Sequence, residues 1–129
     1  MRLLVALIAP LLVAGCSSAT CDESSAEVER ARMLTQERLT RLFTDIQRLA
    51  SSPEARHGWP IRGAFPAELS DLNPTTAKAQ GGEFEVVLKH CMDHRIVLAV
   101  PINQDRQIAL YWGEGPTAGQ QVLWRQPEP

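Results

Sequence analysis

Two common hydrolase motifs are missing from this sequence, which contains neither a Gly-x-Ser-x-Gly stretch nor a His-Glu-x-x-His stretch. It also lacks the runs of basic residues interleaved with aromatic residues that are typical of nucleic-acid-binding proteins. The nearest approach to a dinucleotide-binding loop, residues 113–119, has its third glycine one position late. Charge is nearly balanced, with 13 Lys and Arg against 15 Asp and Glu. We therefore expect no catalytic activity, no nucleic-acid partner and no cofactor.

The longest apolar run is too short to cross a membrane. It extends from Leu3 to Val13, is interrupted by Pro10 and follows the positive charge of Arg2. A helix needs about 20 apolar residues to span a hydrocarbon core of about 30 Å, whereas a shorter run suits the hydrophobic region of a signal peptide. We expect residues 1–15 to be such a signal, which leaves enough chain for one domain.

The end of this run, Val13-Ala14-Gly15-Cys16, resembles the lipobox of bacterial lipoprotein precursors. The resemblance implies that Cys16 receives a diacylglycerol, becomes the first residue after cleavage and is acylated on its amine. Several acyl chains hold a protein firmly, because each buried CH₂ contributes about 0.8 kcal/mol. Ser17, in place of an Asp, resembles the sorting signal for the outer membrane, so we expect a periplasm-facing anchor with residues 16–23 as a lipidated tether. The alternative is an ordinary secretory signal with a chance cysteine.

Two further cysteines, Cys21 and Cys91, form an even pair once Cys16 is assigned to the lipid. An exported protein meets an oxidising compartment, where such pairs form disulfides. A bridge closing a loop of about 70 residues stabilises a fold by about 4 kcal/mol in the chain-entropy model. We expect this bridge; the alternative is two unpaired thiols.

One helix is predicted over residues 24–50, a stretch without Gly or Pro. Ser24 and Glu27 match a capping box at its start. Apolar residues recur at steps of three and four along it, interrupted by Thr35: Val28, Ala31, Leu39, Leu42, Phe43, Ile46 and Leu49. This helix would be about 40 Å long. Its apolar stripe fits either a coiled coil or packing on the chain's own sheet, and we favour the second.

The rest of the domain predicts a small antiparallel sheet. Residues 51–83 are interpreted as a loop with one short helix at 66–72. Alternating apolar residues predict four strands within 84–125, at 84–90, 95–100, 107–112 and 120–125, the last one at an edge. Short connections favour a meander, whose apolar face needs a cover. We therefore predict an α+β fold, with 24–129 as a single domain in which the long helix covers the sheet.

A helix followed by a loop and a meander resembles the type IV pilin and pseudopilin architecture. The resemblance runs from Ser24 onward and includes the loop segment Phe65-Pro66-Ala67-Glu68-Leu69-Ser70-Asp71-Leu72. The N-terminus departs from that family, because a lipobox stands in place of the membrane-entering helix and the Gly-Phe cleavage motif. Polymerisation through a buried N-terminal helix is therefore not expected.

Three groups of residues are candidates for ligand-binding or catalytic sites. His90 and His94 flank Cys91 and are weak candidates for a zinc or copper site, since no fourth ligand is visible. Glu68 and Asp71 lie three apart, and paired carboxylates can act as general acid and base, but these two fit an ordinary solvated face. The third group, Trp59, Trp112 and Trp124, fits either a core or an exposed platform for glycan or peptide.

Two functions follow from these observations. The first is a lipid-anchored, non-catalytic interaction or assembly module that binds an unknown envelope protein. The second is a small periplasmic lipoprotein that binds a ligand or a metal, or is an enzyme, and uses the aromatic residues or the His90/His94 turn.

The lipobox gives a direct prediction. Cys16→Ser removes the acceptor sulfur, so the chain should remain an unlipidated, wrongly processed precursor, while the unchanged chain should begin at an acylated Cys16. Mass spectrometry of the N-terminal peptide measures both. An unmodified mature chain that begins at any other residue contradicts the prediction.

Overall fold

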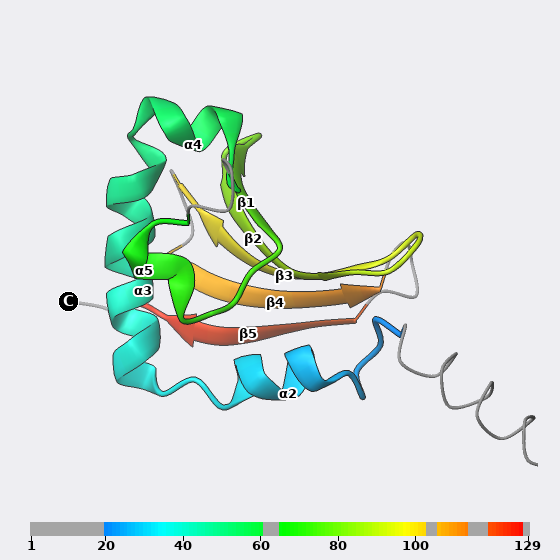
Figure 1. The fold of residues 1–129 in the computed structure, drawn as a ribbon. Helices are drawn as coiled ribbons and strands as arrows, with labels where there is room; N and C mark the ends of the chain where they lie inside the picture. Colours follow the sequence, from blue (N-terminus) through cyan, green and yellow to red (C-terminus); the bar gives the residue numbers. More distant parts are fainter. Residues whose placement is uncertain (1–19, 61–64, 103–105, 114–118, 128–129) are drawn as a thin grey trace, which may run out of the picture.

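The computed structural model describes residues 20–60, 65–102, 106–113 and 119–127, which form helices on one side of a sheet (Figure 1). The four helices are α2 (Ala26–Arg32), α3 (Gln36–Ala50), α4 (Pro53–His57) and α5 (Ala67–Ser70). The five strands are β1 (Thr76–Gln80), β2 (Glu83–His90), β3 (Arg95–Pro101), β4 (Gln107–Gly113) and β5 (Gly119–Arg125). The predicted α+β class is confirmed.

The sheet is an antiparallel meander in the order β1-β2-β3-β4-β5, with the predicted last strand at one edge. The four predicted strands are present to within about a residue, but the count of four was too low. The missed strand, β1, lies in the segment interpreted as a loop. It pairs with β2 through the two-residue turn Gly81-Gly82, whose φ angles are 60° and 83°. Positive φ at both positions is the backbone of a type I′ hairpin turn, and glycine adopts it without steric cost.

The single helix predicted over 24–50 is wrong. The chain leaves helical geometry after Met33, and a new helix begins with Thr35 as its N-cap, whose side chain accepts a hydrogen bond from the backbone N–H of Arg38 at 3.1 Å. In Figure 1, α2 runs along the bottom of the sheet, whereas α3 runs up one side. A straight helix of about 40 Å would extend beyond the sheet, so the break lets both halves pack.

The predicted capping box is also wrong by one position. Ser25, not Ser24, is the N-cap of α2, and its hydroxyl donates to the carbonyl of Thr20 rather than capping the helix. Glu27 turns away from the helix start and lies 3.8 Å from the Nζ of Lys89. The Ser24 hydroxyl donates instead to the Asp22 carboxylate two residues earlier, and Glu27 pairs with Lys89 of β2, so neither side chain caps the helix.

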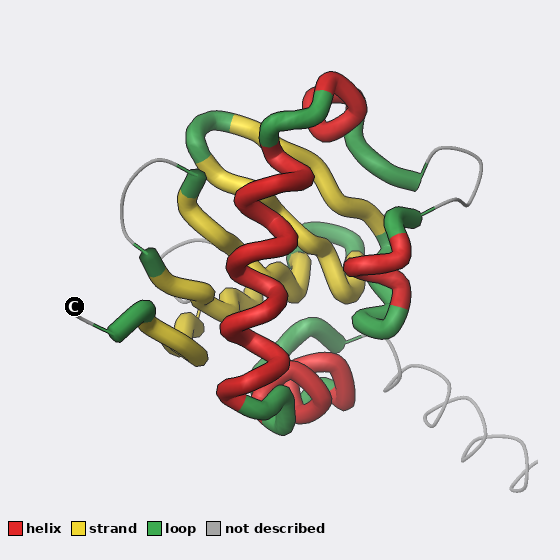
Figure 2. Tube along the Cα trace, turned by 90° about the vertical axis from the view of Figure 1, so that its left-hand side faces the viewer, coloured by secondary structure: helices red, strands yellow, loops and turns green. Residues whose placement is uncertain are grey.

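The core lies between the helices and one face of the sheet. Phe43 of α3 stacks against Trp124 of β5 with ring centroids 4.9 Å apart, and the Trp124 indole N–H donates to the Thr40 hydroxyl at 3.0 Å. Figure 2 shows α3 in front of the strands that it covers. The apolar stripe of α3 thus packs on the chain's own sheet. Its buried residues share one cluster with those of the strands: Leu39, Leu42, Phe43, Ile46, Phe84, Val86, Leu98, Val100, Ile108 and Leu110.

A β-bulge changes the side to which β2 directs its last residues. Val87 pairs with Val97, but Lys89 pairs with Ile96, so Leu88 is the extra residue. Ile96 is buried in the core. Its partner Lys89 therefore lies on the helix side of the sheet, where it reaches Glu27 of α2.

Packing of α3 on the sheet predicts the effect of truncating its aromatic residue. Phe43→Ala should destabilise the domain by about 3–5 kcal/mol, from lost burial and the cavity left behind. Thermal melts of the chain without its lipid should show a large drop that is equal at all protein concentrations, whereas the exposed Thr44→Ala should change stability by less than about 0.5 kcal/mol. A midpoint that rises with concentration, together with a dimer in sedimentation, would instead assign the helix to assembly.

Candidate functional site

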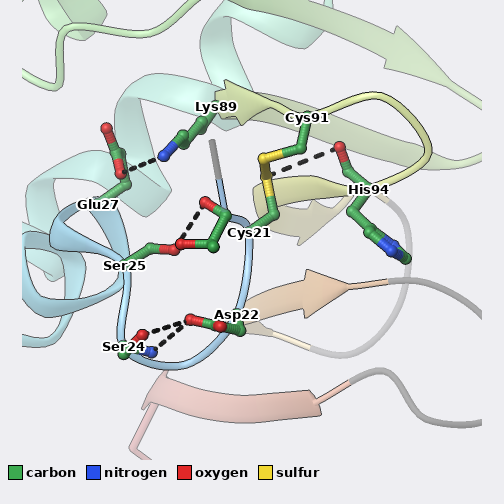
Figure 3. The surroundings of a disulfide bond; sticks show 9 residues. Cys21, Asp22, Ser24, Ser25, Glu27, Lys89, Cys91 and His94 are labelled. Carbon is green, nitrogen blue, oxygen red and sulfur yellow. Dashed lines mark hydrogen bonds and ion pairs between the residues drawn. A yellow bond between two sulfur atoms is a disulfide. The ribbon is translucent and has the colours of Figure 1, made fainter. Parts of the chain in front are cut away.

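The predicted disulfide between Cys21 and Cys91 is confirmed (Figure 3), with a Cα–Cα distance of 6.0 Å. Cys21 is buried in the core cluster at the start of the domain, and Cys91 lies in the β2–β3 turn. That turn is closed by reciprocal backbone bonds: the Cys91 N–H donates to the His94 carbonyl at 2.8 Å, and the His94 N–H donates to the Cys91 carbonyl at 3.2 Å. The bridge therefore ties the first described residues to a well-defined hairpin.

Polar contacts hold the chain on both sides of Cys21 (Figure 3). The Ser24 hydroxyl and backbone N–H both donate to the Asp22 carboxylate, which lowers the pKa of Asp22. Glu27 and Lys89, which are both mostly buried, add an ion pair between α2 and β2. The start of the domain is thus fixed by covalent, hydrogen-bonded and ionic contacts.

The disulfide also defines one end of the molecule. β2 ends and β3 begins there, and in an antiparallel meander β4 ends and β5 begins at the same end. The turn between β1 and β2 lies at the opposite end. We call the first the disulfide end and the second the far end. The predicted lipidation residue, Cys16, lies outside the described residues, and none of the described helices is long and apolar enough to cross a bilayer.

The weak metal candidates, His90 and His94, are both exposed at the disulfide end. Cys91, the third member of that group, is committed to the disulfide and offers no thiolate. Within the described ranges, no three His, Cys, Asp or Glu side chains gather as a metal site requires.

The carboxylates Glu68 and Asp71 stabilise the fold through ion pairs. Arg38 donates to both oxygens of Asp71, at 3.1 and 2.7 Å, and this lowers the pKa of Asp71. The backbone N–H of Glu68 and then Arg48, at 3.0 Å, lower the pKa of Glu68. Both groups stay ionised at neutral pH, and they attach α5 to α3.

The three tryptophans do not form one platform. Trp124 is buried under α3. Trp59 packs against Phe84 next to β1, with ring centroids 6.2 Å apart. Trp112, in β4, lies under the guanidinium of Arg32 at 5.1 Å. The sequence pattern gave no means of telling these three environments apart.

A hollow of about 330 Å³ lies beside β1 and β2. Its volume is at the lower end of the range for small-molecule sites. Its lining is about equally polar and apolar. The polar side chains are those of His57, Thr76, Lys78, Gln80, Glu85 and Arg95, and Trp59, Pro60 and Val87 supply apolar surface. One ion pair, Arg95 with Glu85 at 3.3 Å, crosses the lining.

The two edges of the sheet differ. The outer side of β1 is closed at its centre, because Trp59 and Ala77 exchange two backbone hydrogen bonds of 2.7 and 2.8 Å. On β5, the other outer strand, Gln120, Gln121 and Val122 are exposed. The sequence indicated an edge at β5, but the closure of β1 by a distant loop segment left no sequence signal.

No family model, curated protein or solved structure matches this chain.

The disulfide gives a stability prediction. The double variant Cys21→Ser/Cys91→Ser, which leaves no stray thiol, should lose about 2–5 kcal/mol of unfolding free energy, because the unfolded chain regains the freedom that the bridge removes. Denaturant unfolding measures this loss. The matched control is Met92→Ala in the same turn, a fully exposed side chain, which should change stability by less than about 0.5 kcal/mol. Equal stability of the double variant and the unchanged protein contradicts the assignment.

Proposed function

We propose that this chain is a lipid-anchored envelope protein that acts as a non-catalytic interaction module, held by an acylated Cys16 in the outer membrane and facing the periplasm. The lipobox resemblance supports the anchor, and Ser17 supports the choice of membrane. The Cys21–Cys91 disulfide supports an oxidising compartment.

The observation that carries the proposal is the position of this disulfide. Cys21 follows the lipobox cysteine by five residues. A fully extended chain of that length spans at most about 17 Å. An acylated Cys16 would therefore keep the disulfide end close to the lipid surface. A domain held so close to the membrane is suited to present a surface to another envelope protein.

A second candidate function, binding of a small polar ligand, is favoured by the hollow beside β1. Its cations and its carboxylate suit a ligand with both donor and acceptor groups. The hollow is only partly enclosed and its lining is as polar as it is apolar, however, whereas small-molecule sites are enclosed and mostly apolar. We therefore place this function second.

Co-purification distinguishes the two functions. The tagged, full-length chain is extracted from membranes in mild detergent and analysed by native mass spectrometry, with Cys16→Ser as the unanchored control. We expect the acylated chain to be in a stable complex with a second protein in fixed ratio. An acylated monomer that carries a small molecule or a metal ion contradicts this proposal and supports the second function.

A further inference from the structure

We propose that the outer edge of β5 is the partner-binding surface, and that it takes an extended segment of a different protein whose acidic side chain lies beside Arg125. This inference rests on the proposed function, since it names the surface through which the anchored module would act.

The first argument is that β5 offers hydrogen-bonding groups that β1 does not. A strand at a sheet edge carries unpaired N–H and C=O groups that can pair with another chain. On β1, Trp59 already occupies these groups at Ala77. On β5, Gln36 donates a side-chain N–H to the Leu123 carbonyl at 3.2 Å, beside the bulge, while the exposed stretch Gln120–Val122 continues toward the disulfide end.

The second argument is the composition of this edge. Natural proteins protect edges with charged residues, lysine above all, and β1 has Lys78 at its centre. Residues 119–124 of β5 contain no charged side chain and no proline. Val122 is one of few large apolar side chains that are exposed in the described ranges, at 40%. An edge so little protected is suited to accept a strand.

The third argument is the charge at the far end of β5. Arg106 and Arg125 are both exposed there, and Gln126 donates its backbone N–H to the Arg106 carbonyl at 2.8 Å, which holds the two segments together. In the part of the chain that the structure describes, neither guanidinium forms an ion pair; Arg106 lies over the Phe43 ring at 5.5 Å. Arg106 thus lies on the helix side of the sheet, whereas Arg125 pairs with Gln107 on the opposite side. An acidic side chain of an incoming segment would therefore meet Arg125.

The composition of the edge argues against a second copy of this chain as the occupant. Two identical edges that pair in a closed dimer are related by a two-fold axis, and their strands run antiparallel. The start of one β5 would then face Arg125 of the other, and residues 119–124 contain no acidic side chain. A second copy therefore offers Arg125 no anion from its own edge, whereas a segment of a different protein can.

Photo-crosslinking of the acylated full-length chain in its own cells tests the inference. A benzophenone amino acid replaces Gln120 or Val122, one position per sample. The matched control replaces Gln80, an exposed glutamine on β1. We expect adducts with one other protein from both β5 positions and none from Gln80. The crosslinked peptides should place the two adducts about two residues apart on one segment, with an acidic residue toward Arg125, as in an added strand.

Two surface variants measure the contributions of strand pairing and charge. With the probe at Gln120, Val122→Lys should lower the adduct yield roughly tenfold by protecting the edge, and Arg125→Glu about fivefold. Lys78→Glu, a charge reversal of the same size on β1, should leave the yield unchanged. Circular dichroism of each variant confirms that the fold is retained.

Three results would overturn the inference: adducts between two copies of β5, equal yields at Gln80 and Gln120, and no adduct from either β5 position. The N-terminal peptide of the same samples is analysed for acylation. An acylated chain without β5 adducts refutes this inference but leaves the anchor in place, whereas an unacylated chain refutes the proposed function itself.

Discussion

The apolar face of a five-stranded sheet is too wide for one helix to cover. Strands about 4.8 Å apart make the sheet roughly 19 Å wide, whereas a helix is about 10 Å across. A straight 24–50 helix would leave part of this face in water and extend beyond it. The chain meets this constraint by breaking near Thr35, so that α2 and α3 cover different parts of the sheet. The Arg38–Asp71 ion pair then holds α5 beside α3.

This constraint also separates what the sequence predicted from what it did not. The alternation of apolar residues in β2 to β4 and the apolar stripe of α3 are local patterns. They correctly predicted these strands and a helix that packs on them. The break before Thr35 depends on the size of the sheet, which no local window contains. β1 was missed because Thr76–Gln80 has only alanines on its buried side, although Gly81-Gly82 is a strong hairpin signal.

At the candidate site too, some features could be predicted from the sequence and others could not. Counting cysteines predicted the pair Cys21 and Cys91, because the proposed lipidation of Cys16 leaves an even number. The closure of β1 by Trp59 and the bond between the Gln126 N–H and the Arg106 carbonyl join residues that are far apart in the sequence, so neither could be predicted. The disulfide gives these features a common reference, since it marks the end of the sheet at which β2 and β4 end and β3 and β5 begin.

The difference between the two edges limits how many copies of this domain can join through their sheets. A filament that grows edge to edge needs two open edges on every subunit, so that each added copy presents a new one. Within the described residues, Trp59 pairs with the outer side of β1 at Ala77, whereas the stretch Gln120–Val122 of β5 has no such backbone partner. Association through the sheet, even in the chain freed from its lipid, therefore ends at a pair. Trp59 on β1 thus prevents the addition of further copies edge to edge.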